Sequence, residues 1–150
     1  MRVNEEIKSN FQLAASSIKN ISLKNDFHIL PESEELSFLA DAEYDQISIE
    51  ENETGGFIGS IDLTVTATAK VKKGKKKIVI KVCMNGIFVD SISNDRDSFL
   101  DLLTLNGCAS LYAIIRSIVI SLSAQAMSGG ELILPMVNFF HMKEKKEQGK

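Results

Sequence analysis

Residues 108–127 read CASLYAIIRSIVISLSAQAM, and this stretch decides the fold. Apolar side chains fall on every face of the helix that it predicts, and Arg116 is its one charged residue. A surface helix needs a single apolar stripe, so a helix that is apolar all round must be covered on at least two sides. The rest of a 150-residue chain can supply one cover as a sheet. We expect a second copy of the chain to supply the other, and hence an oligomer.

A membrane span is the alternative interpretation of the same stretch. About 20 apolar residues are enough to cross a bilayer. Arg116 would lie near the centre of that span, where a charge costs roughly 2.5–3.5 kcal/mol. Small residues also recur at spacings of three or four and permit close contact between helices; they are Ser110, Ala113, Ser117, Ser121 and Ala124. We therefore expect a buried helix with an oligomer contact along these residues, and no stable membrane insertion.

The composition is that of one globular domain over residues 1–150, with flexible tails expected at 1–10 and 143–150. Apolar and charged residues make up 44% and 25% of the chain, which is ordinary for a globular protein. The first residues, MRVNEEIKSN, are polar and lack the pattern of a secretory leader, so a cytoplasmic location is expected. The two cysteines, Cys83 and Cys108, make no disulfide framework. No Cys-x-x-Cys or His-x-x-x-His spacing predicts a metal site.

Charges are segregated along the chain. Residues 25–69 contain no Lys or Arg but hold eleven acidic residues, from Asp26 to Asp62, and seven lysines then follow from Lys70 to Lys81. An acidic strand beside a basic one would gain cross-strand attraction. Binding of nucleic acid by Lys70–Lys81 is a remote alternative, because neither arginine nor interleaved aromatic residues accompany the lysines. We expect no enzyme, since the sequence has no glycine-rich phosphate loop and no Ser/His/Asp grouping.

Four strands are expected before the helices. Residues 11–23 alternate with a slip of phase near 16–18, which is typical of a β-bulge. Residues 36–50 alternate in part, and 52–56 predict a turn. Residues 57–71 and 78–89 alternate clearly and flank a turn at Lys73-Gly74, which predicts a hairpin. Gly86 inside the second of these runs indicates a bulge or a close backbone approach.

The helical part follows the fourth strand. Asn94 or Asp95 is expected to cap a short helix that holds Phe99 and ends at Asn106-Gly107. The long helix then begins at residue 108, and Ser128-Gly129-Gly130 ends it. The charged residues 141–150 are either helical or frayed. The order of elements predicts an α+β fold, with a four-stranded antiparallel sheet covered on one face by the long helix.

The order of three segments resembles the SecB family of export chaperones. The segments are FQLAASSIKNISLKN at 11–25, VTATAKVKKGKKKIVIKVCMNGIF at 65–88 and, after the long helix, LPMVNFF at 134–140. The resemblance covers roughly residues 11–140. It implies a dimer of dimers with the helices between the sheets. It also implies an ATP-independent holdase, without a cofactor, that binds non-native polypeptides in apolar surface grooves.

The resemblance further implies that the connection after the first strand and the segment after the long helix form the groove walls. Aromatic and methionine side chains suit promiscuous binding, because they offer large and adaptable apolar area. An extended client can also pair along a sheet edge. The candidate client-binding residues are Phe27, Ile29, Leu30, Phe38, Tyr44, Phe88, Leu134, Val137, Phe139, Phe140 and Met142. The alternative for these residues is a place in the core.

One departure from the family pattern concerns the translocase motor SecA. In the exporting members, acidic side chains on the outer sheet face dock SecA. The matching positions here are Asn20, Lys24 and Lys81, none of which is acidic. A basic SecA tail would meet repulsion there, so SecA docking is not expected. A dedicated chaperone of a toxin–antitoxin system is the alternative to a general export holdase.

Overall fold

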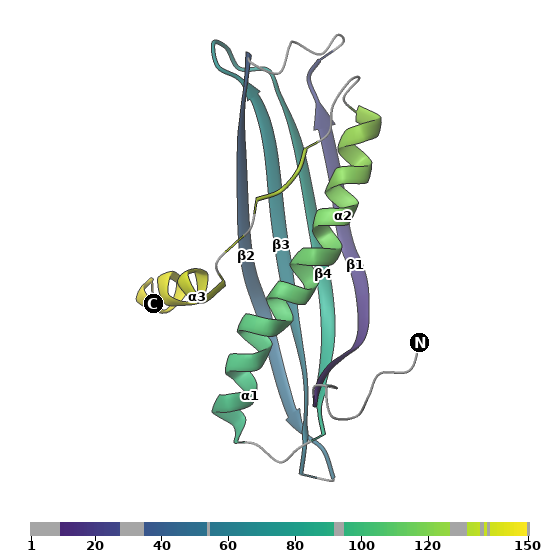
Figure 1. Ribbon diagram of the computed structural model, residues 1–150, viewed down its shortest axis with the longest axis vertical. Coiled ribbons are helices and arrows are strands. Elements are labelled where there is room, and N and C mark those ends of the chain that lie inside the picture. Colours follow the sequence, from purple (N-terminus) through teal and green to yellow (C-terminus); the bar gives the residue numbers. More distant parts are fainter. Residues whose placement is uncertain are drawn as a thin grey trace.

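One antiparallel sheet of four long strands forms the frame of the molecule (Figure 1). The computed structural model describes residues 10–27, 35–53, 55–91, 95–126, 132–135, 137 and 139–149. The strands are β1 (Phe11–Asn25), β2 (Leu36–Glu51), β3 (Phe57–Val71) and β4 (Lys77–Asp90). Their order in the sheet is β1–β4–β3–β2, so β1 and β2 are its two edges.

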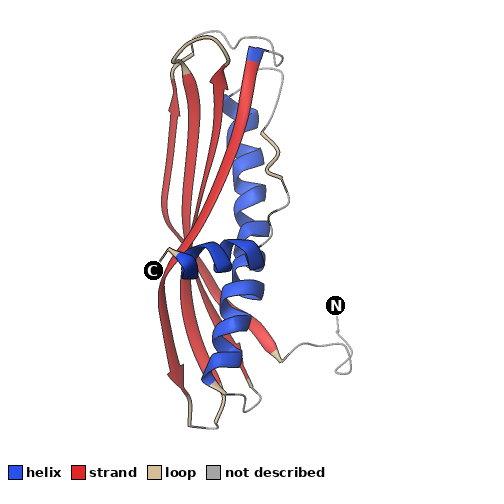
Figure 2. Cartoon of the chain, turned by 90° about the vertical axis from the view of Figure 1, so that its left-hand side faces the viewer, coloured by secondary structure: helices blue, strands red, loops and turns tan. Residues whose placement is uncertain are grey.

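A helical rod crosses one face of this sheet, and the other face carries no helix within the described residues (Figure 2). The rod consists of α1 (Arg96–Leu102), a π-helical turn η2 (Leu103–Gly107) and α2 (Cys108–Ala126). The predicted α+β fold, an antiparallel sheet covered on one face by a long helix, is therefore confirmed. Arg96–Ala126 is long and apolar enough to cross a membrane on those two criteria alone. Its packing on the sheet, with Leu111, Ile115 and Val119 fully buried, favours the core-helix interpretation.

The start of the rod fits the prediction, but the predicted break at Asn106-Gly107 is wrong. Asp95 is the N-cap, and its carboxylate accepts a hydrogen bond of 2.7 Å from the Ser98 backbone N–H. The chain then runs through η2 directly into α2. Gly107 is buried, and a Cβ on it would lie 3.3 Å from the Phe88 ring. The glycine thus lets the rod approach the sheet closely without ending the helix.

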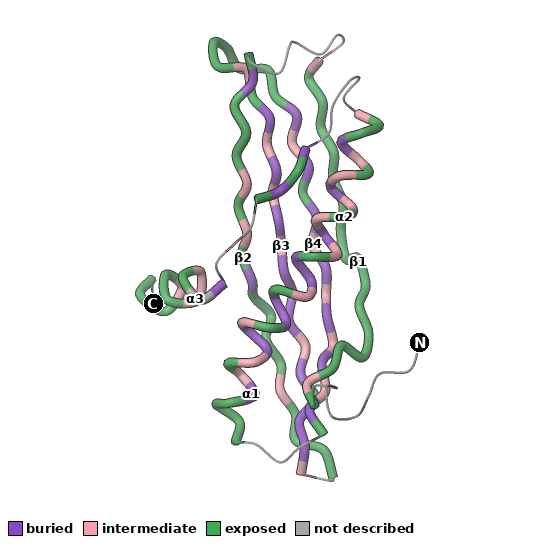
Figure 3. The backbone as a smooth tube through the Cα atoms, viewed as in Figure 1, coloured by how far each residue is buried: buried purple, intermediate pink, exposed green. Residues whose placement is uncertain are grey.

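The core lies between the rod and the two central strands (Figure 3). Alternate residues of β3 and β4 point toward the rod, and Val65 and Val82 are examples, fully buried and directly paired. Gly86 provides the close approach that the sequence predicts. A Cβ there would lie 2.7 Å from the Phe88 ring and 2.8 Å from the Leu111 side chain. A side chain at this position would therefore push the rod away from the sheet.

Both edge strands are irregular. In β1 the register shifts twice, between Leu13 and Ala15 and between Ile18 and Asn20, on either side of the single slip that the sequence predicts. β2 has a bulge between Asp45 and Ser48 that the sequence did not indicate. Gln46 takes a positive φ of 54° in this bulge. Bulges twist an edge strand and interrupt its pairing pattern, so the straight part of the β2 edge ends here.

The C-terminal residues form a helix that contacts the rest of the domain. Helix α3 (Phe139–Gln148) lies beside β2, and two of its lysines contact the rest of the domain (Figure 1). Lys143 forms an ion pair with Asp101, and the Lys146 ammonium donates a hydrogen bond to the Tyr44 carbonyl. Residues 143–148 are therefore helical, which is one of the two alternatives that the sequence leaves open for 141–150.

Candidate functional site

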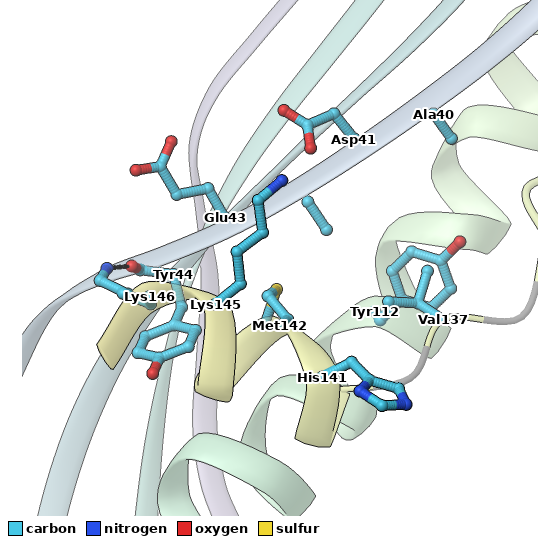
Figure 4. A pocket seen from close by; sticks show the side chains of 11 residues that line it. Ala40, Asp41, Glu43, Tyr44, Tyr112, Val137, His141, Met142, Lys145 and Lys146 are labelled. Atoms are coloured by element: carbon cyan, nitrogen blue, oxygen red, sulfur yellow. Dashed lines mark hydrogen bonds between the residues drawn. The ribbon is translucent and has the colours of Figure 1, made fainter. Parts of the chain in front are cut away.

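Two adjoining hollows follow the free edge of β2. The first, of about 400 Å³, is lined by Phe38–Ala40, by Ala67-Thr68 of β3 and by residues 132–135. The second, of about 510 Å³, is lined by residues 40–44, Tyr112, Val137 and α3 (Figure 4). Because Ala40 lines both hollows, we treat them as one groove and call it the β2 groove.

The far wall of the β2 groove is fixed to α2 by two hydrogen bonds. Ser123 is fully buried, and its hydroxyl oxygen accepts a bond of 2.7 Å from the Leu132 backbone N–H. The Tyr112 hydroxyl donates to the Pro135 carbonyl. Leu132 and Leu134 point into the core, whereas Ile133 is 62% exposed. A short extended segment is thereby held parallel to the groove, with its apolar side chains divided between the core and the surface.

Helix α3 closes the second half of the groove. The Lys146 ammonium lies 4.3 Å from the centre of the Tyr44 ring and donates to the carbonyl of the same residue. Burial raises the pKa of the Tyr44 phenol, and burial also raises the pKa of the Tyr112 phenol. Both phenols are therefore neutral at physiological pH, and neither adds a negative charge to the groove.

The backbone of β2 presents hydrogen-bonding groups to the groove. The Glu35 carbonyl accepts a 2.9 Å bond from the Lys72 backbone N–H, so Glu35 faces β3. The Tyr44 carbonyl instead faces α3. Since backbone groups alternate along a strand, the odd-numbered residues from 35 to 45 bond to β3, and even-numbered residues from 36 to 44 point outward. The N–H and C=O groups of Phe38, Ala40 and Ala42 therefore face the groove.

The candidate client-binding residues divide into three groups. Phe38, Tyr44, Leu134, Val137 and Met142 line the β2 groove. Ile29 and Leu30 lie outside the described residues, as does the side chain of Phe140. The remaining three candidate residues line neither hollow.

The prediction of a groove position is wrong for Phe88, which is fully buried and stacks on Phe11 with 5.1 Å between ring centres. Phe139 is 8% exposed and packs edge-on against Tyr112, so it contacts a residue of the groove lining without lining the groove itself. Phe27 packs against the core near the end of β1, away from both hollows.

Sequence reasoning missed the small residues and the acids of the site. Ala40 and Ala42 line the groove, and their short side chains leave its space empty. Asp41 and Glu43 alternate with these alanines along β2 and have their side chains on the outer face of the sheet. The signal was the alternation of LADAEYD from Leu39 to Asp45, which places alanine on one face of the strand and acids on the other.

The predicted oligomer residues lie on the side of α2 that faces away from the sheet. Ala113, Ser117, Ser121 and Ala124 are exposed, and Ser110 is half-buried. Between them, Arg116 is half-buried, and its Nε is buried without a hydrogen-bond partner among the described residues. The sheet-facing side of α2 is covered by the chain itself, whereas this small-residue stripe is not.

Comparison with solved structures identifies the architecture. The chain is similar to the SecB-like chaperone Rv1957 of Mycobacterium tuberculosis, solved in complex with a ChAD peptide from the antitoxin HigA1 (Rv1956). The TM-score is 0.58 and the identity 14%, over 85% of this chain and 91% of Rv1957. The fold is SecB-like. A protein of unknown function from Streptococcus agalactiae is also similar, with 12% identity, a TM-score of 0.46, and coverage of 84% of this chain and 97% of that one. The sequence matches no family model and no curated protein sequence.

In this SecB-like fold, the three positions matched to SecA docking lie on the outer sheet face. Asn20, Lys24 and Lys81 are exposed, on β1 and β4. Nearby on the same face, Lys19 pairs with the carboxylate of Asp62 at 2.7 Å. This bond, followed by Coulomb attraction to the same carboxylate, raises the pKa of Lys19. Lys24 and Lys81 therefore present two exposed cations on this face of the sheet.

The Lys-rich hairpin also forms as predicted, and its turn residues are exposed. Residues 72–76 connect β3 to β4, and the Val71 backbone N–H donates to the Lys76 carbonyl at 3.2 Å. Within the described ranges, none of the ion pairs involves Lys72, Lys73, Lys75 or Lys76. No three His, Cys, Asp or Glu side chains among the described residues lie close enough together to hold a metal ion.

Proposed function

We propose that the chain is a SecB-like chaperone that binds non-native polypeptide segments in the β2 groove and holds them without ATP. The observation that carries this proposal is the combination of apolar hollows and outward backbone groups along one strand edge. Main-chain pairing gives affinity without reading sequence, while hollows beside it accept different apolar side chains. Such a site is suited to segments that are unfolded rather than to one folded partner.

The exposed apolar residues of the site support the same function. Phe38 is 55% exposed, Leu39 71% and Ile133 62%, all around the first hollow. Large exposed apolar patches on soluble proteins usually mark binding sites. A phenylalanine and two aliphatic side chains offer broad contact with few directional constraints, as clients of varied sequence require.

We propose that copies of the chain assemble as a dimer of dimers through β1 and the exposed side of α2. The exposed small residues of α2, among them Ala113, Ser117 and Ser121, support this additional cover, because small side chains permit close contact between helices. The helix-facing side of β1 exposes Leu13, Ile18, Ile21 and Leu23 by 38–50%. Burial of this surface against another copy would leave the β2 groove on the outside.

A dedicated client of antitoxin type is favoured over general export by the charges of the outer face. Lys24 and Lys81 present positive charge where SecA docking requires acids. Rv1957 is itself a SecB-like chaperone that was solved with an antitoxin peptide. We place this activity in the cytoplasm, in keeping with the two free thiols, Cys83 and Cys108.

The proposal is tested by aggregation assays without nucleotide. The purified protein should suppress aggregation of a chemically unfolded reporter enzyme at near-stoichiometric ratios. Phe38→Asp combined with Ile133→Asp should abolish suppression, because charges would enter the first hollow. Ile47→Asp is the matched control, since Ile47 is 40% exposed on the same strand but lies in the bulge. Equal suppression by all three proteins, or none by the natural chain, would contradict the proposal.

A further inference from the structure

The β2 groove has two chemically different sides, and this asymmetry defines a class of client segment. The second hollow is lined by odd-numbered and even-numbered residues alike, from Ala40 to Tyr44. A hollow over one face of a sheet would be lined by alternate residues only, because side chains alternate across a strand. The hollow therefore lies beside the strand edge, where an added strand would contact both faces.

The face toward α2 is apolar and contains empty space. Ala40 places only a methyl group there, across from Tyr112 and Val137 (Figure 4). Ala42 also lines the hollow and likewise contributes only a methyl group. In an added strand, the residues opposite these two alanines would point into the hollow. Large apolar side chains fit these positions, and Tyr44 with Lys146 closes the next one along.

The other face is acidic. Asp41 and Glu43 pair with Thr66 and Thr64 of β3, which places their side chains on the outer face. Both carboxylates are exposed, and no ion pair within the described ranges includes either of them. Lys145 rises from α3 toward β2 in Figure 4 without forming such a pair. These two acids therefore lack a fixed counter-charge.

We propose that the β2 groove selects extended segments in which large apolar residues alternate with lysine or arginine. The apolar residues would enter the hollow beside Ala40 and Ala42, and the basic residues would pair across the strand edge with Asp41 and Glu43. Because alternation reads the same in both directions, the preference holds for parallel and antiparallel addition. This inference rests on the proposed function. It adds that the order of apolar and basic residues in a client segment affects its affinity, and not the composition alone.

The test uses two fluorescent peptides of identical length and composition. In one, leucine or phenylalanine alternates with lysine; in the other, the same apolar residues form one block and the lysines another. Since opposite-charge pairs across strands contribute roughly 0.2–1 kcal/mol each, we expect the alternating peptide to bind about tenfold more tightly. Equal affinities would overturn the inference.

Charge-reversed chains test the assigned partners. Asp41→Lys with Glu43→Lys should weaken binding of the lysine peptide by about tenfold and tighten binding of an alternating peptide with glutamate in place of lysine. Glu50→Lys with Glu51→Lys is the matched control, because these acids are exposed on the same strand beyond the bulge. The control should leave both affinities within about twofold. The neutral pair Asp41→Asn with Glu43→Gln should give an intermediate affinity, since it preserves side-chain shape.

The outcomes separate this inference from the proposed function. Binding of the blocked peptide as tightly as the alternating one, with normal suppression of aggregation, would leave the holdase standing and remove the pattern. Failure of every peptide to bind, together with failure to suppress aggregation, would contradict the proposed function itself. A similar loss in the control pair as in the Asp41 and Glu43 pair would show unspecific attraction and would also overturn the pattern.

Discussion

Both edges of the sheet expose apolar side chains, but they differ in what lies beside them. On β1 the exposed residues include Ile21 and Leu23, and α2 lies beside this strand (Figure 1). On β2 a second wall, made by residues 132–135 and α3, faces the strand across a groove. An open apolar edge suits a flat and permanent partner, whereas a walled edge suits a narrow and exchangeable one. We therefore propose assembly through β1 and client binding at β2.

The largest expected effect is loss of assembly after charges are placed on β1. Ile21→Asp with Leu23→Asp would put two carboxylates into the apolar contact that we propose between copies. Burying unpaired charges costs several kcal/mol each, so the assembled species should give way to smaller ones. Light scattering coupled to gel filtration measures the change in mass.

The control for this prediction places the same charges at the other edge of the sheet. Phe38→Asp with Ile133→Asp adds the same charge beside β2, where both side chains are exposed. Its mass should equal that of the natural protein, and its suppression of aggregation should be lost. If the β2 pair dissociates the oligomer and the β1 pair does not, the assignment of the two edges is reversed.

The next effect concerns the empty space of the groove. Ala42→Trp should fill the second hollow and weaken client-peptide binding by about tenfold or more, because the hollow accepts client side chains only while it is empty. Fluorescence anisotropy with a labelled peptide measures the affinity. Ala15→Trp is the matched control, since Ala15 is exposed on the outer face of β1. Unchanged affinity in Ala42→Trp would place the client elsewhere.

The strands of the sheet could be predicted from the sequence, because they depend on local periodicity. Phe57–Val71 was predicted to the residue, since one face of the strand is apolar throughout and the other carries threonine and lysine. The continuous rod was missed, because Asn106-Gly107 indicates a helix end locally. The close approach of Gly107 to Phe88 explains a glycine at this position without a helix end.

The groove was predicted by the kind of residue but not by its arrangement. The sequence shows that a residue is aromatic but not whether it lies in a core or in a groove. Phe88 and Phe38 could therefore not be told apart. Position relative to the sheet edge separates them, and this depends on the strand order β1–β4–β3–β2. The role of α3 was missed for a similar reason, because Lys146 and Tyr44, which are in contact, are 102 residues apart in the sequence.

A smaller effect is expected from releasing α3. Lys146→Met would remove the hydrogen bond to the Tyr44 carbonyl and the contact with its ring while retaining the apolar stem. The edge would gain a free acceptor at the closed end of the groove. We expect client affinity to rise by about threefold, since such partly exposed contacts contribute roughly 0.5–1 kcal/mol. Gln148→Met, at an exposed α3 residue outside the groove lining, serves as the control. A loss of affinity in Lys146→Met would mean that α3 helps to hold the client.

A last effect concerns stability rather than binding, and it is a dependence on alkaline pH that arises from the buried Cys108. Burial raises the pKa of the Cys108 thiol from 9.0 to about 12, against a smaller opposing effect of Lys146. The unfolded thiol ionises first, so the stability that it contributes is complete below pH 9 and is lost as the pH rises toward 12. At pH 10 the loss should be about 1 kcal/mol, measured by urea unfolding. Cys108→Ala should flatten this part of the profile, whereas Cys83→Ala should not. An identical slope in both variants would place the alkaline sensitivity in the tyrosines rather than in the thiol.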